Sequence, residues 1–271
     1  MGNVAQHYDI TGLTDKIAAA LQAAGKDLTQ LTTADLAPID EFHVRGRKAT
    51  VELAERLEVG PGSHVLDVGS GLGGPTRTLA QTRGCRVTGI DLSATFCEAA
   101  RELSRWVGLA DKVSFFQGDA TDLPHGAAAF DAAMTLHVAM NIARKDLLYA
   151  GVRRVLKPGR IFAIYDIVQG EGGAVHYPVP WARDPSISHL ASKDQMRSLL
   201  EGAGFRVEAE QDSTEAGEAW FKQAAAKLAG SSAPPVGLRQ FLGSDAAQMT
   251  QNQVRNLTER RIRTVMYVCR S

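Results

Sequence analysis

One segment of this chain carries the strongest structural signal, Val65-Leu66-Asp67-Val68-Gly69-Ser70-Gly71-Leu72-Gly73-Gly74. Its apolar start is typical of a strand, and the glycines are followed by Pro75, a favoured first residue of a helix. Glycine has no Cβ, so the backbone of such a turn lets a ligand approach closely. The segment therefore predicts a strand, a ligand-binding turn and a helix.

Strand-like and helical segments alternate along the rest of the chain. The expected strands are Val65–Val68, Arg86–Ile90, Val113–Gln117, Phe130–Leu136, Arg160–Val168, Phe205–Ala209 and Thr264–Cys269. The expected helices are Pro75–Thr82, Ala94–Val107, Lys145–Leu156, one that a capping box opens at Ser192, and one near Ala216–Leu228. Such alternation predicts an α/β fold with a Rossmann-like, mostly parallel sheet and helices on both of its faces.

Helical sequence also precedes the first strand. Residues 11–36 carry Ile17 and Leu21 among many alanines. From Lys48 onward, Ala49, Leu53 and Leu57 recur at four-residue steps, which predicts an amphipathic helix that stops at Gly60-Pro61-Gly62.

The charges balance, with 30 Lys+Arg against 30 Asp+Glu in 271 residues. A balanced chain has no broad attraction to nucleic acid, so we expect no nucleic-acid partner. The densest basic cluster, Arg255 to Arg263, also contains Glu259 and is interpreted as a solvated helix face.

The three cysteines, Cys85, Cys97 and Cys269, are odd in number and far apart, with neither a disulfide framework nor zinc-ligand spacing. They favour a reducing compartment, and we expect a cytoplasmic protein with no metal site. No run of 18 apolar residues occurs, so we expect no membrane span.

A carboxylate beside the glycine turn discriminates between nucleotide ligands. Asp67 lies two residues before Gly69, where it would repel the pyrophosphate of a dinucleotide and attract a cationic ligand such as S-adenosylmethionine. The alternatives are that Asp67 hydrogen-bonds the turn itself, or that the glycines serve an NAD-dependent dehydrogenase.

Two more carboxylates stand at strand ends. Asp91 ends the second strand, 22 residues after Gly69, where a carboxylate can accept from both ribose hydroxyls. Asp119 follows the third strand and could accept from an adenine amino group, while the Ala120 N–H donates to a ring nitrogen. The alternative for Asp119 is a helix or turn cap. Together they predict a nucleoside site.

These segments resemble the class I S-adenosylmethionine-dependent methyltransferases from Asp40 to about Phe221, and within them the sarcosine/dimethylglycine N-methyltransferase-like group. The resembling stretches are Asp40–Gly46, Val65–Gly74, Gly118-Asp119, His137–Ile142 and Tyr177–Ala182. The resemblance implies a seven-stranded sheet, an N-terminal helical lid at residues 1–47, and a methyltransferase domain at residues 48–271 with an insertion at about 170–190.

The cofactor expected from this resemblance is S-adenosyl-L-methionine, which leaves as S-adenosyl-L-homocysteine. The residues expected to bind it are Asp67, Gly69, Ser70, Gly71, Gly73, Asp91, Leu92, Asp119, Ala120 and Leu136. Arg47, Arg144 and Lys145 depart from the pattern of the N-methyltransferase-like group.

The acceptor site is expected where the fourth strand ends. His137 is the first candidate base, because ligands of parallel sheets lie at the carboxyl ends of the strands. The alternative is a packed histidine that bonds a carbonyl. Asn141 would orient a polar acceptor or cap a helix. His43, the third catalytic candidate, would come from the lid.

Aromatic and apolar side chains are expected to contact the acceptor, namely Tyr8, Met140, Tyr177 and Trp181. Tyr177 and Trp181 could face a methylated ammonium through cation–π contact or simply pack the core. Arg45, Arg47 and Arg183 are candidate partners for an acceptor carboxylate, with a surface position as the alternative.

The leading prediction is methyl transfer from S-adenosylmethionine to a small acceptor, first of all a sarcosine- or dimethylglycine-like amine. O- or C-methylation of a natural product, quinone or lipid precursor is the alternative within the same fold. Outside that class, a noncatalytic S-adenosylmethionine-binding protein and a dehydrogenase remain open. A homodimer is also left open.

Overall fold

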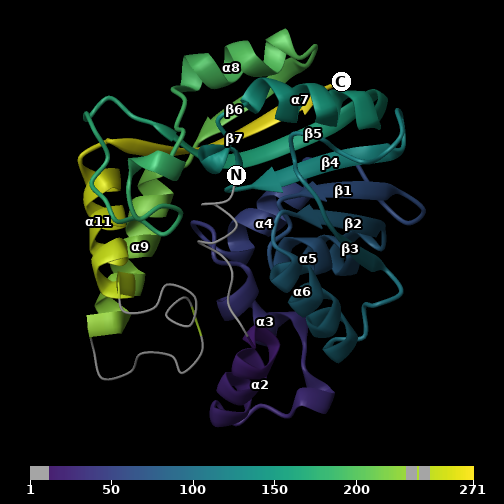
Figure 1. Ribbon diagram of the computed structural model, residues 1–271, viewed down its shortest axis with the longest axis vertical. Coiled ribbons are helices and arrows are strands. Elements are labelled where there is room, and N and C mark those ends of the chain that lie inside the picture. The colour runs from purple at the N-terminus through teal and green to yellow at the C-terminus, as the bar shows by residue number, and fades with distance from the viewer. Residues whose placement is uncertain (1–11, 230–236, 238–244) are drawn as a thin grey trace.

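The computed structural model describes residues 12–229, 237 and 245–271. They form one seven-stranded sheet with the strand order β3-β2-β1-β4-β5-β7-β6 and helices on both faces (Figure 1). Neighbouring strands are parallel except at β7, which runs antiparallel to both β5 and β6. The predicted Rossmann-like, mostly parallel sheet is confirmed.

The strands are β1 (His64–Val68), β2 (Arg86–Asp91), β3 (Val113–Gln117), β4 (Phe130–Leu136), β5 (Leu156–Gln169), β6 (Arg206–Asp212) and β7 (Ile262–Arg270). The helices among them are α5 (Gly74–Arg83), α6 (Ala94–Trp106), α7 (Lys145–Val155), α8 (Lys193–Gly202), α9 (Thr214–Ala229) and α11 (Ala246–Thr258). Every strand and helix expected among these elements overlaps an observed one. The capping box of α8 is confirmed, because the Ser192 hydroxyl accepts from the Gln195 N–H at 3.2 Å.

The N-terminal segment contains α2 (Leu13–Ala23), the 3-10 turn η1 (Leu28–Gln30) and α3 (Thr33–Asp40), and α4 (Arg47–Ala54) then leads to the sheet. Leu13, Ile17 and Leu36 are buried in one cluster with Leu72 and Leu103 of the main domain. The described part of the expected lid is therefore packed firmly on α5 and α6. The lid boundary at residue 47 stays a prediction.

A buried ion pair joins α3 to the glycine turn. Arg77 Nη2 donates to Asp40 Oδ2 at 2.5 Å and to the Leu72 carbonyl at 2.6 Å. Its Nη1 donates to the Ala100 carbonyl at 3.1 Å and to Ser104 Oγ at 3.0 Å. One fully buried guanidinium thus connects α3, the turn and α6.

Two helical predictions need correction. The helix expected from Lys48 to Gly60 ends at Ala54, because the chain turns there and Glu58 takes a φ of 52°, which a right-handed helix does not allow. The arginine cluster is not one helix face. Arg255 lies on α11, Arg260 follows it in a turn, and Arg263 lies on β7 because the last strand already begins at Ile262. Each of these arginines is paired with a carboxylate.

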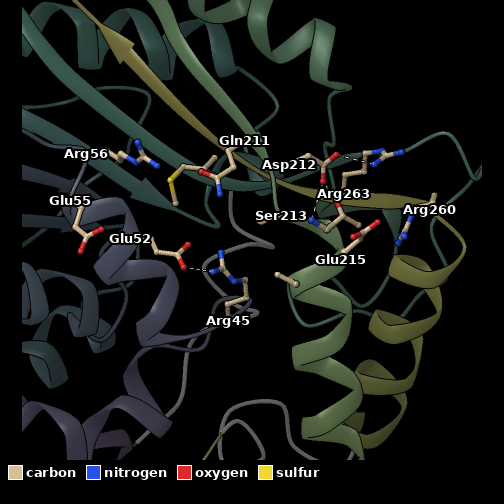
Figure 2. Close-up of a pocket in the computed structure, with 13 residues that line it drawn as sticks. Arg45, Glu52, Glu55, Arg56, Gln211, Asp212, Ser213, Glu215, Arg260 and Arg263 are labelled. Atoms are coloured by element: carbon tan, nitrogen blue, oxygen red, sulfur yellow. Dashed lines mark hydrogen bonds and ion pairs between the residues drawn. The ribbon is translucent and has the colours of Figure 1, made fainter.

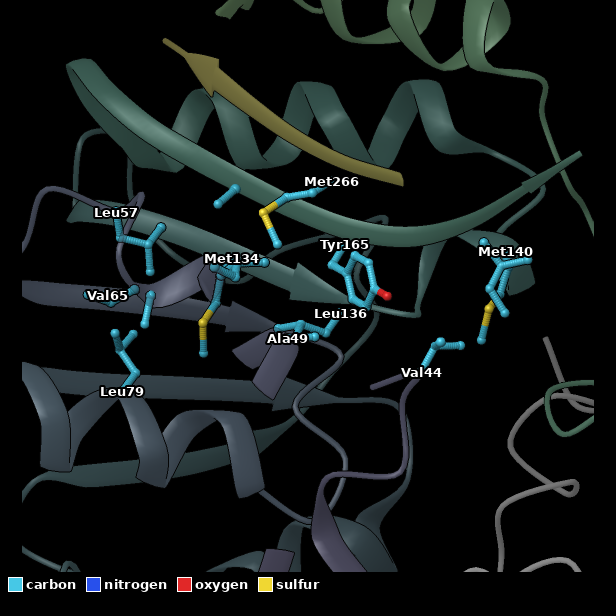
Figure 3. Close-up of a cluster of buried hydrophobic side chains, with 14 of the residues drawn as sticks. Val44, Ala49, Leu57, Val65, Leu79, Met134, Leu136, Met140, Tyr165 and Met266 are labelled. Carbon is cyan, nitrogen blue, oxygen red and sulfur yellow. The ribbon is translucent and has the colours of Figure 1, made fainter. Parts of the chain in front are cut away.

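A large part of the core lies on the sheet face that α4 and α5 cover. Figure 3 shows Leu57, Val65, Leu79 and Met134 meeting there. The same cluster continues to Val44, Leu136 and Met140 at the carboxyl end of β4. Within the described ranges, no helix is long and apolar enough to cross a membrane.

Candidate functional site

A cavity of about 530 Å³ opens at the carboxyl ends of β1, β2 and β4. The strand order reverses between β1 and β4, which is the place where open α/β sheets bind ligands. Its lining comes from the glycine turn, the ends of β2, β3 and β4, residues 40–44, the insertion between β5 and α8, α9 and α11. The cavity therefore brings the expected cofactor and acceptor regions together.

The glycine turn is packed too closely for side chains. Gly69 has a φ of 74°, and a Cβ placed on it would lie 2.2 Å from Val138 Cγ2. Gly73 has a φ of 79°, and its Cβ would meet Phe115 Cζ at 2.5 Å. Ser70 Oγ is buried at the cavity and has no hydrogen-bond partner in the described part of the chain. The turn thus forms a cradle with a polar atom left for a ligand.

Asp91 and Asp119 both line the cavity, as expected. Asp91 accepts from the Gly71 N–H at 2.8 Å and from the Ser93 N–H at 2.9 Å, so its carboxylate also holds the turn. Burial raises the pKa of Asp91. Asp119 accepts from the Thr121 N–H at 2.8 Å, which is the turn-capping role considered as its alternative. The expected cofactor residues Leu92, Ala120 and Leu136 line the cavity as well.

Asp67 lies behind the turn and does not line the cavity, nor does Gly73. The Asp67 carboxylate accepts from Thr76 Oγ1 at 2.6 Å and is 1% exposed. Burial raises its pKa to about 7. This geometry corresponds to the alternative in which Asp67 ties the turn to the following helix. Direct contact of Asp67 with a cofactor stays a prediction.

His137 occupies a sharp turn directly after β4. Its φ is 54°, a left-handed value that is uncommon for a residue with a Cβ and often marks a functional position. Its N–H donates to the Tyr165 carbonyl at 2.8 Å, and Asp166 accepts from the Ala139 N–H at 2.7 Å. The imidazole Nε2 is buried without a partner among the described residues. The turn therefore presents an unused ring nitrogen.

His43 lies beside His137, with their ring centroids 5.9 Å apart. His43 Nε2 donates to the Gly46 carbonyl at 3.0 Å, so in the neutral ring the lone pair lies on Nδ1. Burial lowers the pKa of His43 to about 4 and that of His137 well below its ordinary value. Both rings line the cavity and are uncharged at neutral pH.

Asn141 lines the cavity, but its side-chain amide donates both of its hydrogens to carbonyls of the insertion. Its Nδ2 donates to the Trp181 carbonyl at 2.9 Å and to the Ile187 carbonyl at 2.7 Å. This fixes the insertion on η2 (Ala139–Asn141), and only the amide oxygen remains for an acceptor.

The expected acceptor contacts separate into two groups. Met140 and Trp181 line the cavity, whereas Tyr177 packs against the core and does not reach the lining. Tyr8 lies outside the described residues.

The three arginines expected to bind an acceptor carboxylate have other partners. Arg45 pairs with Glu52 at 2.5 Å, Arg47 donates to Thr33 Oγ1 at 3.0 Å, and Arg183 pairs with Asp245. None of the three lines the cavity. Arg144 does, but it forms two hydrogen bonds to Asp146, at 2.9 and 2.7 Å.

Several site residues were not predicted from the sequence, among them Val44, His189 and Phe221 in the cavity lining. Gln253 of α11 lines the cavity, and nothing local in the sequence singled it out. Asp166, which holds the His137 turn, does carry a signal, because it is a lone charge inside the apolar strand Ile161–Val168. A buried carboxylate in such a strand must have partners.

A second cavity of about 450 Å³ lies between α4 and the start of α9. Figure 2 shows Glu52 and Glu55 on one side of it and Asp212 and Arg263 on the other. Arg45 pairs there with Glu52, and Arg263 with Asp212. Tyr165 lies between the two cavities, with its ring 5.1 Å from His137 and its hydroxyl accepting from Ser213.

The family comparison matches residues 66–164 to a family described as "Methyltransferase domain". The O-methyltransferase cnsE of Penicillium expansum is 33% identical over 214 residues, which are 76% of this chain and 72% of that protein. The methyltransferase GfsG of Streptomyces halstedii is 39% identical over 134 residues, 49% of this chain and 48% of that protein. The match thus spans about half the length of GfsG.

Solved structures share the fold over nearly the whole chain. The [4+2]-cyclase SpnF is 25% identical with a TM-score of 0.69, and the match covers 94% of this chain and 93% of that one. A candidate sarcosine dimethylglycine methyltransferase of Galdieria sulphuraria is 17% identical with a TM-score of 0.71, covering 95% and 97%. A Haemonchus contortus phosphoethanolamine N-methyltransferase in complex with S-adenosyl-L-methionine is 18% identical with a TM-score of 0.75, covering 99% and 60%.

Proposed function

This chain belongs to the class I S-adenosylmethionine-dependent methyltransferases, and from that membership we propose that it methylates a hydroxyl oxygen of a small, largely apolar acceptor. The observation that carries the proposal is a cavity with an apolar wall and three histidines, His43, His137 and His189, whose pKa values burial lowers. Membership also sets aside the dehydrogenase and the noncatalytic binding protein.

The cofactor half of the cavity fits S-adenosylmethionine. The turn at Gly69 has no room for a Cβ, Ser70 Oγ needs a partner, and the carboxylates of Asp91 and Asp119 can accept from hydroxyl and amino groups. When bound, the cofactor supplies an electrophilic methyl carbon on a sulfonium. In its ionised form, the buried Asp67 carboxylate behind the turn favours a cationic ligand over a pyrophosphate.

The charges around the cavity disfavour an amino-acid acceptor. Sarcosine and dimethylglycine carry a carboxylate, which needs a cation or several N–H donors when it is removed from water. Among the described lining residues, Arg144 is the only Lys or Arg, and it is already paired with Asp146. His43 and His137 are neutral. A neutral acceptor fits this lining better.

The rest of the lining favours an apolar body. The acceptor side carries Val44, Met140, Ile167, Trp181, Ile187 and Phe221. Burial of such surface contributes about 25 cal/mol for each Å² of acceptor removed from water. The relatedness to the O-methyltransferase cnsE supports an oxygen as the methylated atom.

His137 is proposed as the general base. Its Nε2 has no protein partner among the described residues and can accept the hydroxyl proton as the oxygen attacks the methyl carbon. The backbone turn that carries the ring is held by the Tyr165 carbonyl, which accepts from the His137 N–H, and by Asp166, which accepts from the Ala139 N–H. The ring itself packs beside the rings of Tyr165 and His43. The remaining work is alignment of the nucleophile and exclusion of water, which can supply up to about 7–11 kcal/mol.

The test compares acceptor classes under one assay. Purified protein with S-adenosylmethionine is offered sarcosine, dimethylglycine and a panel of phenols and aliphatic alcohols, and S-adenosylhomocysteine release is measured. A methyl-¹³C cofactor then shows by NMR whether oxygen, nitrogen or carbon was methylated. Turnover of phenols or alcohols with an O-methyl signal supports the proposal. Turnover of sarcosine, or a C-methyl signal, overturns it.

A further inference from the structure

We propose that Gln253 recognises a second polar group of the acceptor, a neutral hydrogen-bond donor such as a hydroxyl or an amide N–H, at a distance from the oxygen that is methylated. This deepens the proposed function and rests on it for the identity of the reacting group. The recognition itself is a binding property that can be measured without turnover.

Gln253 places a buried side-chain amide at the cavity. Its side chain lines the cavity and is 1% exposed. Its Oε1 has no hydrogen-bond partner in the part of the chain that the structure describes. A buried amide oxygen without a partner destabilises a folded protein, so such an atom requires an explanation. A ligand group that donates to Oε1 supplies one.

The neighbouring amides Asn252 and Asn256 of the same helix are both hydrogen-bonded, which sets them apart from Gln253. Asn252 donates from Nδ2 to the Pro178 carbonyl at 2.9 Å and accepts from Gln248 at 3.0 Å. Asn256 accepts from the His176 N–H at 2.8 Å and donates to the His176 carbonyl at 3.0 Å. Both amides attach α11 to the insertion. They hold the helix in place, and Gln253 projects from it with its own oxygen free.

The position of Gln253 assigns it to the acceptor. It comes from α11, whereas the cofactor residues come from the glycine turn and the ends of β2 and β3. The lining elements that adjoin α11 along the chain and in space are α9, which supplies Phe221, and the insertion, which supplies Trp181. An apolar acceptor with one hydroxyl at His137 and a second donor at Gln253 would be bound at both polar points.

The first experiment needs no ligand. Gln253→Met replaces the amide by an apolar side chain of similar length, and Asn252→Leu is the matched control on the same helix. The melting temperature of the ligand-free protein should rise for Gln253→Met, because an unpaired buried polar group is removed. It should fall for Asn252→Leu, which breaks two hydrogen bonds. A fall for Gln253→Met would show a structural role and overturn the proposal.

The second experiment measures recognition with a matched pair of probes, 1-naphthol and naphthalene-1,5-diol. Binding to the S-adenosylhomocysteine-loaded protein is followed by calorimetry. The wild type should bind the diol about tenfold more tightly, and Gln253→Met should bind both probes within about twofold, because sites built for a polar group discriminate against its absence. Equal binding of the two probes by the wild type, or no binding of either, overturns the proposal.

Two readouts separate this proposal from the function on which it rests. Gln253→Met should leave the affinity for S-adenosylhomocysteine unchanged, and a loss there would place Gln253 at the cofactor and contradict the assignment. A diol preference that depends on Gln253, without O-methylation of any acceptor, would leave the recognition intact and refute the reaction. O-methylation with no diol preference that depends on Gln253 would support the reaction and refute the recognition.

Discussion

The two halves of the cavity are built in different ways. The cofactor half comes from β1, β2, β3 and the turns that follow them. Apart from Ser70 Oγ, its polar groups largely bond one another, as Asp91 does with the Gly71 N–H. The acceptor half is assembled from residues 40–44, the β4 turn, the insertion, α9 and α11. There, His137 Nε2 and Gln253 Oε1 have no partner within the described residues.

The cofactor half is therefore built from local sequence, and the acceptor half from distant segments. A local strand–turn–helix unit can hold the same cofactor in any chain that repeats it, because few long-range contacts are needed. An acceptor wall collected from distant segments can change one segment at a time. His137 Nε2 and Gln253 Oε1 are then the atoms at which we expect a ligand to form the missing hydrogen bonds.

The largest effect is expected in the acceptor half, from His137→Asn. Removal of a general base should lower kcat/KM by about 10²–10⁴-fold. Because burial lowers the pKa of His137, the wild-type base stays neutral on acidification, so the acid limb of the kcat/KM profile should lie below pH 6.5. Steady-state assays from pH 5 to 9 check both points, and unchanged S-adenosylhomocysteine affinity is the control. A variant with wild-type kcat/KM would remove His137 from the mechanism.

The next effect tests how firmly the N-terminal segment is attached to the cofactor half. Arg77→Leu leaves Asp40 buried and unpaired, so the free energy of unfolding should fall by about 3–5 kcal/mol. The exposed pair of Arg105 and Glu102 is the matched control, and Arg105→Leu should cost less than about 1 kcal/mol. Chemical denaturation measures both. Equal losses would mean that the Arg77 network contributes no more than a surface pair.

A smaller loss is expected from crowding at the glycine turn. Gly69→Ala combines a positive φ with a Cβ 2.2 Å from Val138, and it should destabilise by about 2–4 kcal/mol. Gly62 has a φ of 89° and open space around it, so Gly62→Ala isolates the backbone term of about 1–2 kcal/mol. Only Gly69→Ala should also weaken S-adenosylhomocysteine binding in a titration. Weaker S-adenosylhomocysteine binding by both variants would contradict a specific role of the Gly69 turn in cofactor binding.

The smallest effect concerns the charge of Asp67. Burial raises the pKa of Asp67 to about 7, so below that pH the neutral form is favoured in the ligand-free fold. The contribution of the neutral carboxyl to folding stability is therefore lost as pH rises from about 4 towards 7. A cationic ligand favours the ionised form. Affinity for S-adenosylmethionine, whose sulfonium is cationic, should therefore rise about tenfold from pH 6 to 8. In Asp67→Asn, which keeps an acceptor for Thr76, the slope should vanish, and an unchanged slope would assign it to another group.

Local patterns predicted the sheet, and several residues expected at the cofactor line one cavity. Gly69 and Asp91 could be placed because strand, turn and helix follow one another within a few residues, and their geometry is determined locally. Asp67 lies behind the turn, where its carboxylate accepts from Thr76 Oγ1, and its direct contact with a cofactor stays a prediction. Tyr177 and Trp181 are four residues apart in one loop, and only tertiary packing selects Trp181 for the lining.

Residues brought in from afar escaped prediction for a physical reason. Gln253 reaches the cavity because tertiary contacts place α11 there: the helix packs on α9 and β7, and Asn252 and Asn256 bond residues 74 and 80 positions earlier in the chain. Such cross-chain hydrogen bonds leave no periodic signature in the sequence.

The place of β7 in the sheet has a consequence for how the protein is made. β7 pairs with β5 on one side and with β6 on the other, and it is β6's sole neighbour in the described sheet. As the chain leaves the ribosome, β6 emerges some fifty residues before β7 and must wait without a strand partner. Sheet completion is therefore delayed until residue 270 is free, and a stall before that point leaves two exposed strand edges.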